Sequence, residues 1–177
     1  MDDWKEGIAM KERHVRMDGQ PVALAGRELR VGETAPDFTL RDQDLGVRGL
    51  EEFGSQVKLI STVVSLDTDL CDQQTRQLNE EVEAMPNTVA ITVSADLPFA
   101  QKRWCGAAGL HDAVTLSDHY DVRFGRDYGV LIPKLRLLSR AVFVLDGGNT
   151  IVYREYVPEV SQHPDYQQVI KVVRGLQ

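Results

Sequence analysis

Two cysteines, Cys71 and Cys105, are the only thiols in this chain of 177 residues. Cys71 ends the stretch SLDTDLC, after the apolar run VKLISTVVSL and before a segment rich in helix-forming residues, 71–84. This junction predicts that Cys71 lies in the first turn of a helix, where free backbone N–H groups and the helix dipole favour a thiolate. Because the thiolate is the nucleophilic form, the position indicates a reactive thiol, although a buried inert cysteine is an alternative.

Thr68 precedes Cys71 by three residues and is the predicted N-cap of the helix. Its hydroxyl can cap the helix, or it can hydrogen-bond the sulfur or a substrate oxygen. Three aspartates flank the cysteine: Asp67, Asp69 and Asp72. Nearby anions disfavour a thiolate, so a reactive Cys71 requires a cation. Arg140, which opens the apolar strand RAVFVLD, is the favoured candidate, and Arg76 on the helix is the second.

Cys105 lies in QKRWCGAAGL, too far from Cys71 for a C-x-x-C motif. The four histidines are scattered without the spacing of metal ligands, so we expect no metal site and no bound organic cofactor. The two cysteines are either unrelated thiols or a nucleophile and a second thiol that attacks it after oxidation. In the latter case Cys71 would form a sulfenic acid, and Cys105 would condense with it to a disulfide.

The composition narrows the partners and the location. The formal net charge of −7 argues against nucleic acid or an anionic membrane as a partner. No apolar stretch approaches the roughly 18 residues that span a bilayer. The N-terminal residues are charged and lack the apolar core of a signal peptide, so we expect a cytoplasmic protein. A structural disulfide is not expected in that reducing compartment.

The hydrophobic pattern predicts strands and helices that alternate in the middle of the chain. A polar tail, 1–13, precedes a hairpin at 14–26 with Asp18-Gly19 at its turn. Further strands are expected at 38–40, 57–66, 87–95 and 113–118, a second hairpin at 141–157, and helices at 71–84, 98–108 and 163–176. This order predicts an α/β three-layer fold of the thioredoxin type, with residues 14–177 in one domain.

Three stretches resemble the thiol peroxidase group of atypical two-cysteine peroxiredoxins. SLDTDLC resembles the family's P-S-x-D-T-x-x-C loop, and SADLPFAQKRWCGAAGL resembles the segment around its second cysteine. LLSRAVFVLDGGNTIVYREYV resembles the strand that opens with the family's active-site arginine. The resemblance runs from about His14 to the C-terminus. It implies a thioredoxin-like fold with an extra N-terminal β-hairpin, and a homodimer.

The same resemblance implies a role for each residue that matches the motifs. Cys71 is the peroxidatic nucleophile and Cys105 the resolving cysteine, while Thr68 orients the peroxide and Arg140 stabilises the thiolate and the transition state. The implied activity is reduction of hydrogen peroxide and alkyl hydroperoxides through a Cys71–Cys105 disulfide, recycled by thioredoxin. A disulfide needs α-carbons within about 7 Å. Because the cysteines lie on different predicted helices, we expect one or both helices to unwind partly during turnover.

Two positions depart from the family pattern. Val64 replaces the proline seven residues before the nucleophile, which keeps an apolar shield but loses rigidity and restores a backbone N–H. Asp69 adds an anion in the first helical turn. These departures favour an alternative function, a non-enzymatic peroxide sensor or redox relay with a weakened site. A third hypothesis is a thioredoxin-fold binding module with inert cysteines.

Overall fold

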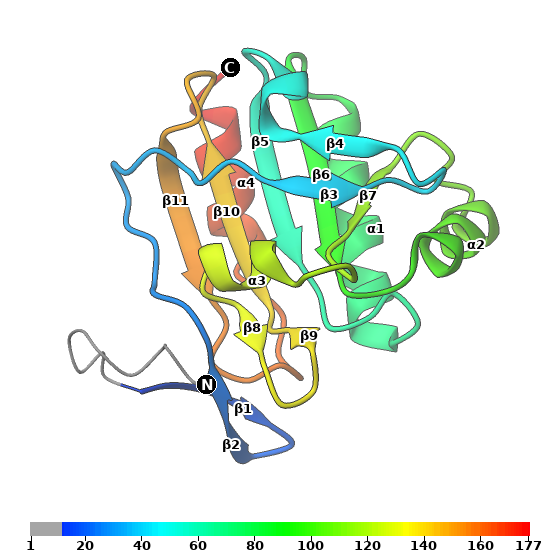
Figure 1. The fold of residues 1–177 in the computed structure, drawn as a ribbon. Helices are drawn as coiled ribbons and strands as arrows, with labels where there is room; N and C mark the ends of the chain where they lie inside the picture. The colour runs from blue at the N-terminus through cyan, green and yellow to red at the C-terminus, as the bar shows by residue number, and fades with distance from the viewer. Residues whose placement is uncertain (1–11) are drawn as a thin grey trace.

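The computed structural model describes residues 12–177, built around a mixed seven-stranded sheet (Figure 1). The strands lie in the order β11-β10-β5-β6-β7-β3-β4, and the central β5, β6 and β7 are parallel. Their bounds are β3 (Thr39–Arg41), β4 (Val47–Gly49), β5 (Val57–Thr62), β6 (Thr88–Ser94), β7 (Val114–Ser117), β10 (Ala141–Leu145) and β11 (Ile151–Tyr156). β10 runs antiparallel to β5, and β3 antiparallel to β7.

Helices lie on both faces of this sheet (Figure 1). The helical segments are η1 (Leu50–Phe53), α1 (Asp69–Glu83), α2 (Pro98–Ala108), α3 (Arg123–Asp127) and α4 (Tyr166–Arg174). α1 and α4 cover one face, α3 lies on the opposite face, and α2 lies beside β7. Two small antiparallel pairs complete the fold: β1 (Arg13–Met17) with β2 (Gln20–Leu24), and β8 (Leu131–Ile132) with β9 (Leu137–Leu138).

The central strands β5, β6 and β7 are buried along most of their length, because both faces of the sheet are covered. Successive side chains of a strand point to opposite faces. On β5, Leu59 therefore packs with α1 and α4, whereas Ile60 joins the cluster on the opposite face. Val144 and Phe143 of β10 divide between the same two clusters. β10 is thus held from both sides, and it begins at the residue after Arg140.

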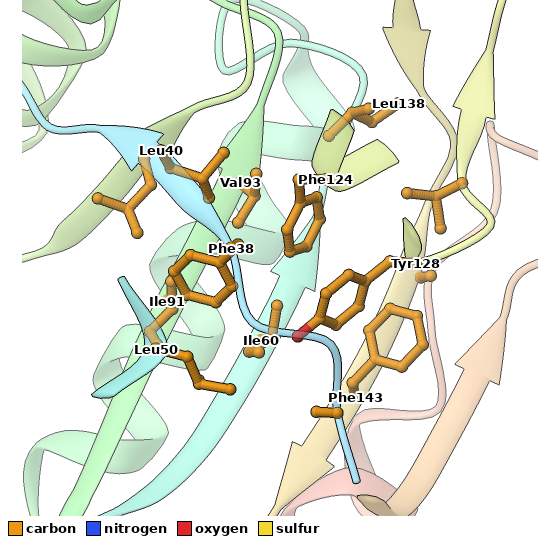
Figure 2. Packing of buried hydrophobic residues seen from close by; sticks show 14 of the residues in the cluster. Phe38, Leu40, Leu50, Ile60, Ile91, Val93, Phe124, Tyr128, Leu138 and Phe143 are labelled. Atoms are coloured by element: carbon orange, nitrogen blue, oxygen red, sulfur yellow. The ribbon is translucent and has the colours of Figure 1, made fainter. Parts of the chain in front are cut away.

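Aromatic rings fill the cluster on the face opposite α1 (Figure 2). Phe124 stacks on Tyr128 with ring centroids 4.1 Å apart, and Phe38 meets Phe124 edge-on at 5.7 Å. Tyr128 in turn meets Phe143 of β10 edge-on at 5.3 Å. Such pairs add packing energy beyond their buried area, so this face gives the sheet a rigid support.

The expected fold agrees with the structure in its main elements and differs at the short ones. Pro98 opens α2, and Gly109 ends it with a left-handed φ of 71°. α1 begins at Asp69, directly after the predicted N-cap Thr68 and two residues before the predicted range 71–84, and β5 ends at Thr62, so the predicted strand to residue 66 was too long. β4, η1, α3, β8 and β9 were not predicted. The predicted tail lies almost wholly outside the described residues.

A buried carboxyl group, that of Asp118, connects β7 to α3. Asp118 is 2% exposed and accepts hydrogen bonds from the backbone N–H groups of Phe124 at 3.2 Å and Gly125 at 2.9 Å. Burial is the main cause that raises the pKa of Asp118 from 3.8 to about 6. The folded protein therefore retains this proton at a pH where the unfolded chain has lost it.

This difference predicts that the contribution of Asp118 to folding stability falls as the pH rises from about 4 to above 6. The folded-state pKa of Asp118 exceeds the unfolded value, so its stabilising contribution is complete below the unfolded pKa and is lost as the pH passes the folded pKa. At about 1.4 kcal/mol per pKa unit, the loss amounts to roughly 3 kcal/mol. Urea unfolding of the wild type and Asp118→Asn at several pH values checks this. Because asparagine does not titrate, the unfolding free energy of the wild type relative to Asp118→Asn should fall as the pH rises from about 4 to above 6, and a constant difference would contradict the prediction.

Candidate active site

Cys71 lies fully buried in the first turn of α1, and an arginine contacts its sulfur. Nη2 of Arg140 donates a hydrogen bond to Cys71 Sγ at 3.3 Å. Arg140 is only 2% exposed, although guanidinium groups are seldom buried without partners. The structure therefore brings together a thiol and a cation that are 69 positions apart in the sequence.

The remaining contacts of Arg140 fix the direction of its guanidinium group. Nη1 donates to Oε1 of Gln74 at 2.6 Å, while Nε and Nη2 donate to the carbonyl of Val160 at 3.1 and 2.9 Å. Gln74 is itself held, because its Nε2 donates to Ser61 Oγ at 2.5 Å. Both oxygen partners of Arg140 are uncharged. Its positive charge is consequently available to the sulfur.

Gln74 and Val160 were not identified from the sequence. Gln74 follows Cys71 by three residues on α1, so the two side chains share a helix face. A glutamine among the apolar positions of an amphipathic helix was the available signal. No comparable signal marked Val160, since it contributes a backbone carbonyl.

Thr68 occupies the N-cap position of α1, as predicted, but its side chain does not cap the helix. Its hydroxyl donates to the carbonyl of Ser65 at 2.8 Å, and the residue is exposed. The hydroxyl makes no hydrogen bond with Cys71 Sγ in the described part of the chain. Of the functions considered for Thr68, contact with a substrate oxygen remains a prediction.

The loop before α1 is held by a carboxylate that sequence reasoning overlooked. Asp96 accepts hydrogen bonds from Ser65 Oγ at 2.6 Å, from the backbone N–H of Leu66 at 2.8 Å and from Ser94 Oγ at 2.7 Å. Val64, at the family's proline position, packs against the apolar cluster that contains Cys71. Side-chain and backbone bonds to Asp96 thus restrain the loop where a proline ring is missing.

Two of the three flanking aspartates are paired with other cations. Asp67 accepts from Arg103 at 2.7 Å, and Asp72 accepts from Arg76 at 3.0 Å. Arg76, the second candidate cation, therefore interacts with a carboxylate and not with the sulfur. Both pairs lie at the surface, where water screens their charge.

Cys105 is also buried, at 2% exposure, and belongs to the same apolar cluster as Cys71. Its sulfur accepts from Nε2 of Gln43 at 3.3 Å and lies 3.7 Å from Oγ1 of Thr115. Burial raises the pKa of the Cys105 thiol, although its two polar neighbours act in the opposite direction. Both cysteines are free, and they contact different groups.

No metal or membrane feature accompanies this site. Within residues 12–177, no three side chains among His, Cys, Asp and Glu are grouped so that they could hold a metal ion. Across the same residues, every helix is too short or too polar to cross a bilayer.

Comparison with known proteins identifies the protein family to which this chain belongs. Residues 30–170 match the Redoxin family model. A peroxiredoxin-like protein from Aquifex aeolicus has a similar structure, with a TM-score of 0.86 and 36% identity over 93% of this chain and 98% of that one. The chain therefore belongs to the Redoxin family, and its fold is the thioredoxin-like α/β fold of peroxiredoxins.

Relatives with a higher sequence identity place this chain in one group within the family. Thiol peroxidase from Streptococcus pneumoniae (strain ATCC BAA-255 / R6) is 50% identical over 158 residues, which cover 89% of this chain and 97% of that protein. Thiol peroxidase from Listeria monocytogenes serotype 4b is 51% identical over 154 residues, 87% of this chain and 93% of its own length. Within the family, this chain is a peroxiredoxin-type enzyme of the thiol peroxidase group.

Proposed function

We propose that this protein reduces hydrogen peroxide and alkyl hydroperoxides with Cys71 as the nucleophile and Cys105 as the resolving thiol. The observation that carries the proposal is the buried hydrogen bond from Arg140 to Cys71 Sγ. A cation in a site shielded from water favours the thiolate and stabilises negative charge that moves along the reaction axis. The presence of Cys105 in the same apolar cluster supports the second step.

In the first step the Cys71 thiolate attacks one peroxide oxygen. A sulfur–oxygen bond forms while the O–O bond breaks, and the departing alkoxide or hydroxide takes up a proton. The sulfur loses two electrons and becomes a sulfenic acid. Arg140 is proposed to stabilise the sulfur before the attack and the separating oxygens during it. Thr68 is proposed to orient the peroxide.

In the second step the Cys105 sulfur attacks the sulfenic sulfur of Cys71. The S–S bond forms, the S–O bond breaks, and the hydroxyl group leaves as water with the proton from Cys105. A dithiol then reduces the disulfide by thiol–disulfide exchange. The resemblance of this chain to thiol peroxidases supports thioredoxin as that dithiol and a homodimer as the assembly.

The test is rapid mixing of the reduced protein with cumene hydroperoxide, followed by tryptophan fluorescence, for the wild type, Cys71→Ser and Cys105→Ser. We expect the wild type to oxidise at least about a hundredfold faster than a free thiol. Cys71→Ser should not respond. Cys105→Ser should accumulate a sulfenic acid that dimedone traps, without an intramolecular disulfide.

Steady-state turnover separates the enzyme from the sensor. With thioredoxin, its reductase and NADPH, we expect sustained peroxide consumption by the wild type alone. Fast oxidation of Cys71 without sustained peroxide consumption, whichever dithiol is supplied, would instead favour a peroxide sensor or redox relay. Oxidation at the rate of a free thiol would refute a peroxidase site and leave the inert binding module.

A further inference from the structure

A hydrogen bond joins the helices of the two cysteines at the residues next to them. Nε1 of Trp104, the residue before Cys105, donates to Oδ1 of Asp72, the residue after Cys71, at 2.8 Å. Trp104 is 7% exposed and the Asp72 side chain 32% exposed, so this bond is shielded from water on the tryptophan side and partly open on the other. Hydrogen bonds to a charged partner are stronger than neutral ones.

Arg76 extends this contact into a three-residue cluster, hereafter the clasp: Asp72, Arg76 and Trp104. Nε of Arg76 lies 3.0 Å from both carboxylate oxygens of Asp72, and its guanidinium carbon lies 5.5 Å from the centre of the Trp104 ring. Nη1 of Arg76 also donates at 3.2 Å to the carbonyl of Ala108, the last residue of α2. The clasp therefore connects the start of α1 with the end of α2.

The clasp joins the two helical turns that carry the cysteines. Successive residues of a helix point about 100° apart. On α1, Asp72 faces α2 whereas Cys71 faces Arg140. On α2, Trp104 faces α1 whereas Cys105 faces Gln43 and Thr115. Because the two sulfurs contact different groups, a disulfide requires one or both of these helical turns to move, and the Asp72–Trp104 hydrogen bond joins those turns.

We infer that the clasp slows disulfide formation. Asp72 and Trp104 act as positioning residues that hold the sulfenic acid of Cys71 away from Cys105. This inference rests on the proposed function. After the first step, Cys71 sulfenic acid has two fates. Cys105 can attack it with loss of water, or a second peroxide can oxidise the sulfur by two further electrons to a sulfinic acid, releasing an alcohol or water. A slower disulfide step lengthens the time available for the second fate.

The experiment measures the two chemical steps separately in the full-length reduced protein. One equivalent of hydrogen peroxide is added, the reaction is quenched with acid, and free thiol, sulfenic acid and disulfide are counted by intact mass after trapping. Trp104→Phe keeps an aromatic ring but lacks the indole N–H, and Asp72→Ala removes the acceptor. We expect the rate constant of disulfide formation to rise about tenfold in both variants, the size of one lost hydrogen bond to a charged group. Sulfenic acid formation should be unchanged, because Arg140 and its partners are intact.

Sensitivity to excess peroxide provides a second readout of the disulfide step. The peroxide concentration that converts half of Cys71 to sulfinic acid should rise about tenfold in both variants, in proportion to the faster disulfide step. Asp67→Asn is the matched control. It removes an ion pair with Arg103 between the same two segments, but both side chains are more than half exposed, so we expect less than a twofold change.

Two failures are distinguishable. If the wild type forms sulfenic acid and disulfide but both variants form the disulfide no faster, the inference that the clasp slows disulfide formation is refuted. The proposed function then stands. If the wild type forms no sulfenic acid at Cys71, both inferences fail.

Hydrogen exchange of the reduced proteins adds a test without peroxide. Amides at the start of α1 and the end of α2 should exchange faster in Trp104→Phe than in the wild type, and equal exchange would contradict the clasp.

Discussion

Replacing Arg140 by methionine should lower the second-order rate constant for peroxide by about 10²–10³, the usual consequence of removing one donor aimed at developing charge. The methionine retains much of the apolar stem but cannot donate to Cys71 Sγ. Arg140→Lys should lose less, because it keeps the charge without the planar group that binds Gln74 and Val160 together. Competition with a peroxidase of known rate measures the constant for each variant.

The control for Arg140 is Arg123→Met. Arg123 pairs with Asp127 within α3, and its side chain is 76% exposed, so the substitution removes the same charge far from any buried contact. Its rate constant should remain within about twofold of the wild type. Circular dichroism and thermal unfolding must show that Arg140→Met is folded. A folded Arg140→Met variant with the rate of the wild type would exclude the proposed part of Arg140.

Replacing Asp96 by alanine should have the second-largest effect, because it acts on stability and rate together. The substitution removes the carboxylate that accepts three hydrogen bonds. The donors left without this acceptor are the hydroxyl of Ser65, the N–H of Leu66 and the hydroxyl of Ser94. We expect the free energy of unfolding to fall by about 2–4 kcal/mol, given about 1–3 kcal/mol for each polar group left unpaired. The rate constant for peroxide should fall up to about 10²-fold, since small displacements of a nucleophile have effects of that size.

A second substitution tests why the Asp96 variant is slow. If the loop has lost its restraint, Val64→Pro in the Asp96→Ala background should recover part of the rate, since a proline ring limits the backbone directly. Asp44→Ala is the control, because this exposed carboxylate pairs only with Lys102 among the described side chains. Asp96 would act other than through the loop if Val64→Pro recovered none of the rate constant for peroxide while the rate constant of Asp44→Ala equalled that of the wild type.

The order of the main elements was predictable from the sequence because local rules govern it. Buried parallel strands appear as continuous apolar runs, and proline and glycine limit helices at backbone positions that suit them. α2 illustrates this, since Pro98 and Gly109 mark its two ends. Three short motifs also sufficed to identify the group to which the chain belongs, as the 50% identity with a thiol peroxidase confirms.

The short elements were not predictable because their stability comes from distant partners. α3 has five residues and packs through Phe124 on Phe38, and β8 has two residues, of which Leu131 forms a bridge with Ala25. Such pairings depend on how remote segments meet, and a sequence window of that length contains no period to detect.

The sequence determined which chemistry is available: a thiol at a helix start, a second thiol, and an arginine ahead of a buried strand. The tertiary structure alone decided which groups meet. It places Arg140 against the Cys71 sulfur and Asp96 against the loop before α1. It also sets Asp72 against Trp104. The reason is physical: residue types follow from local rules, whereas hydrogen bonds between residues 30 or more positions apart depend on the packing of helices on the sheet.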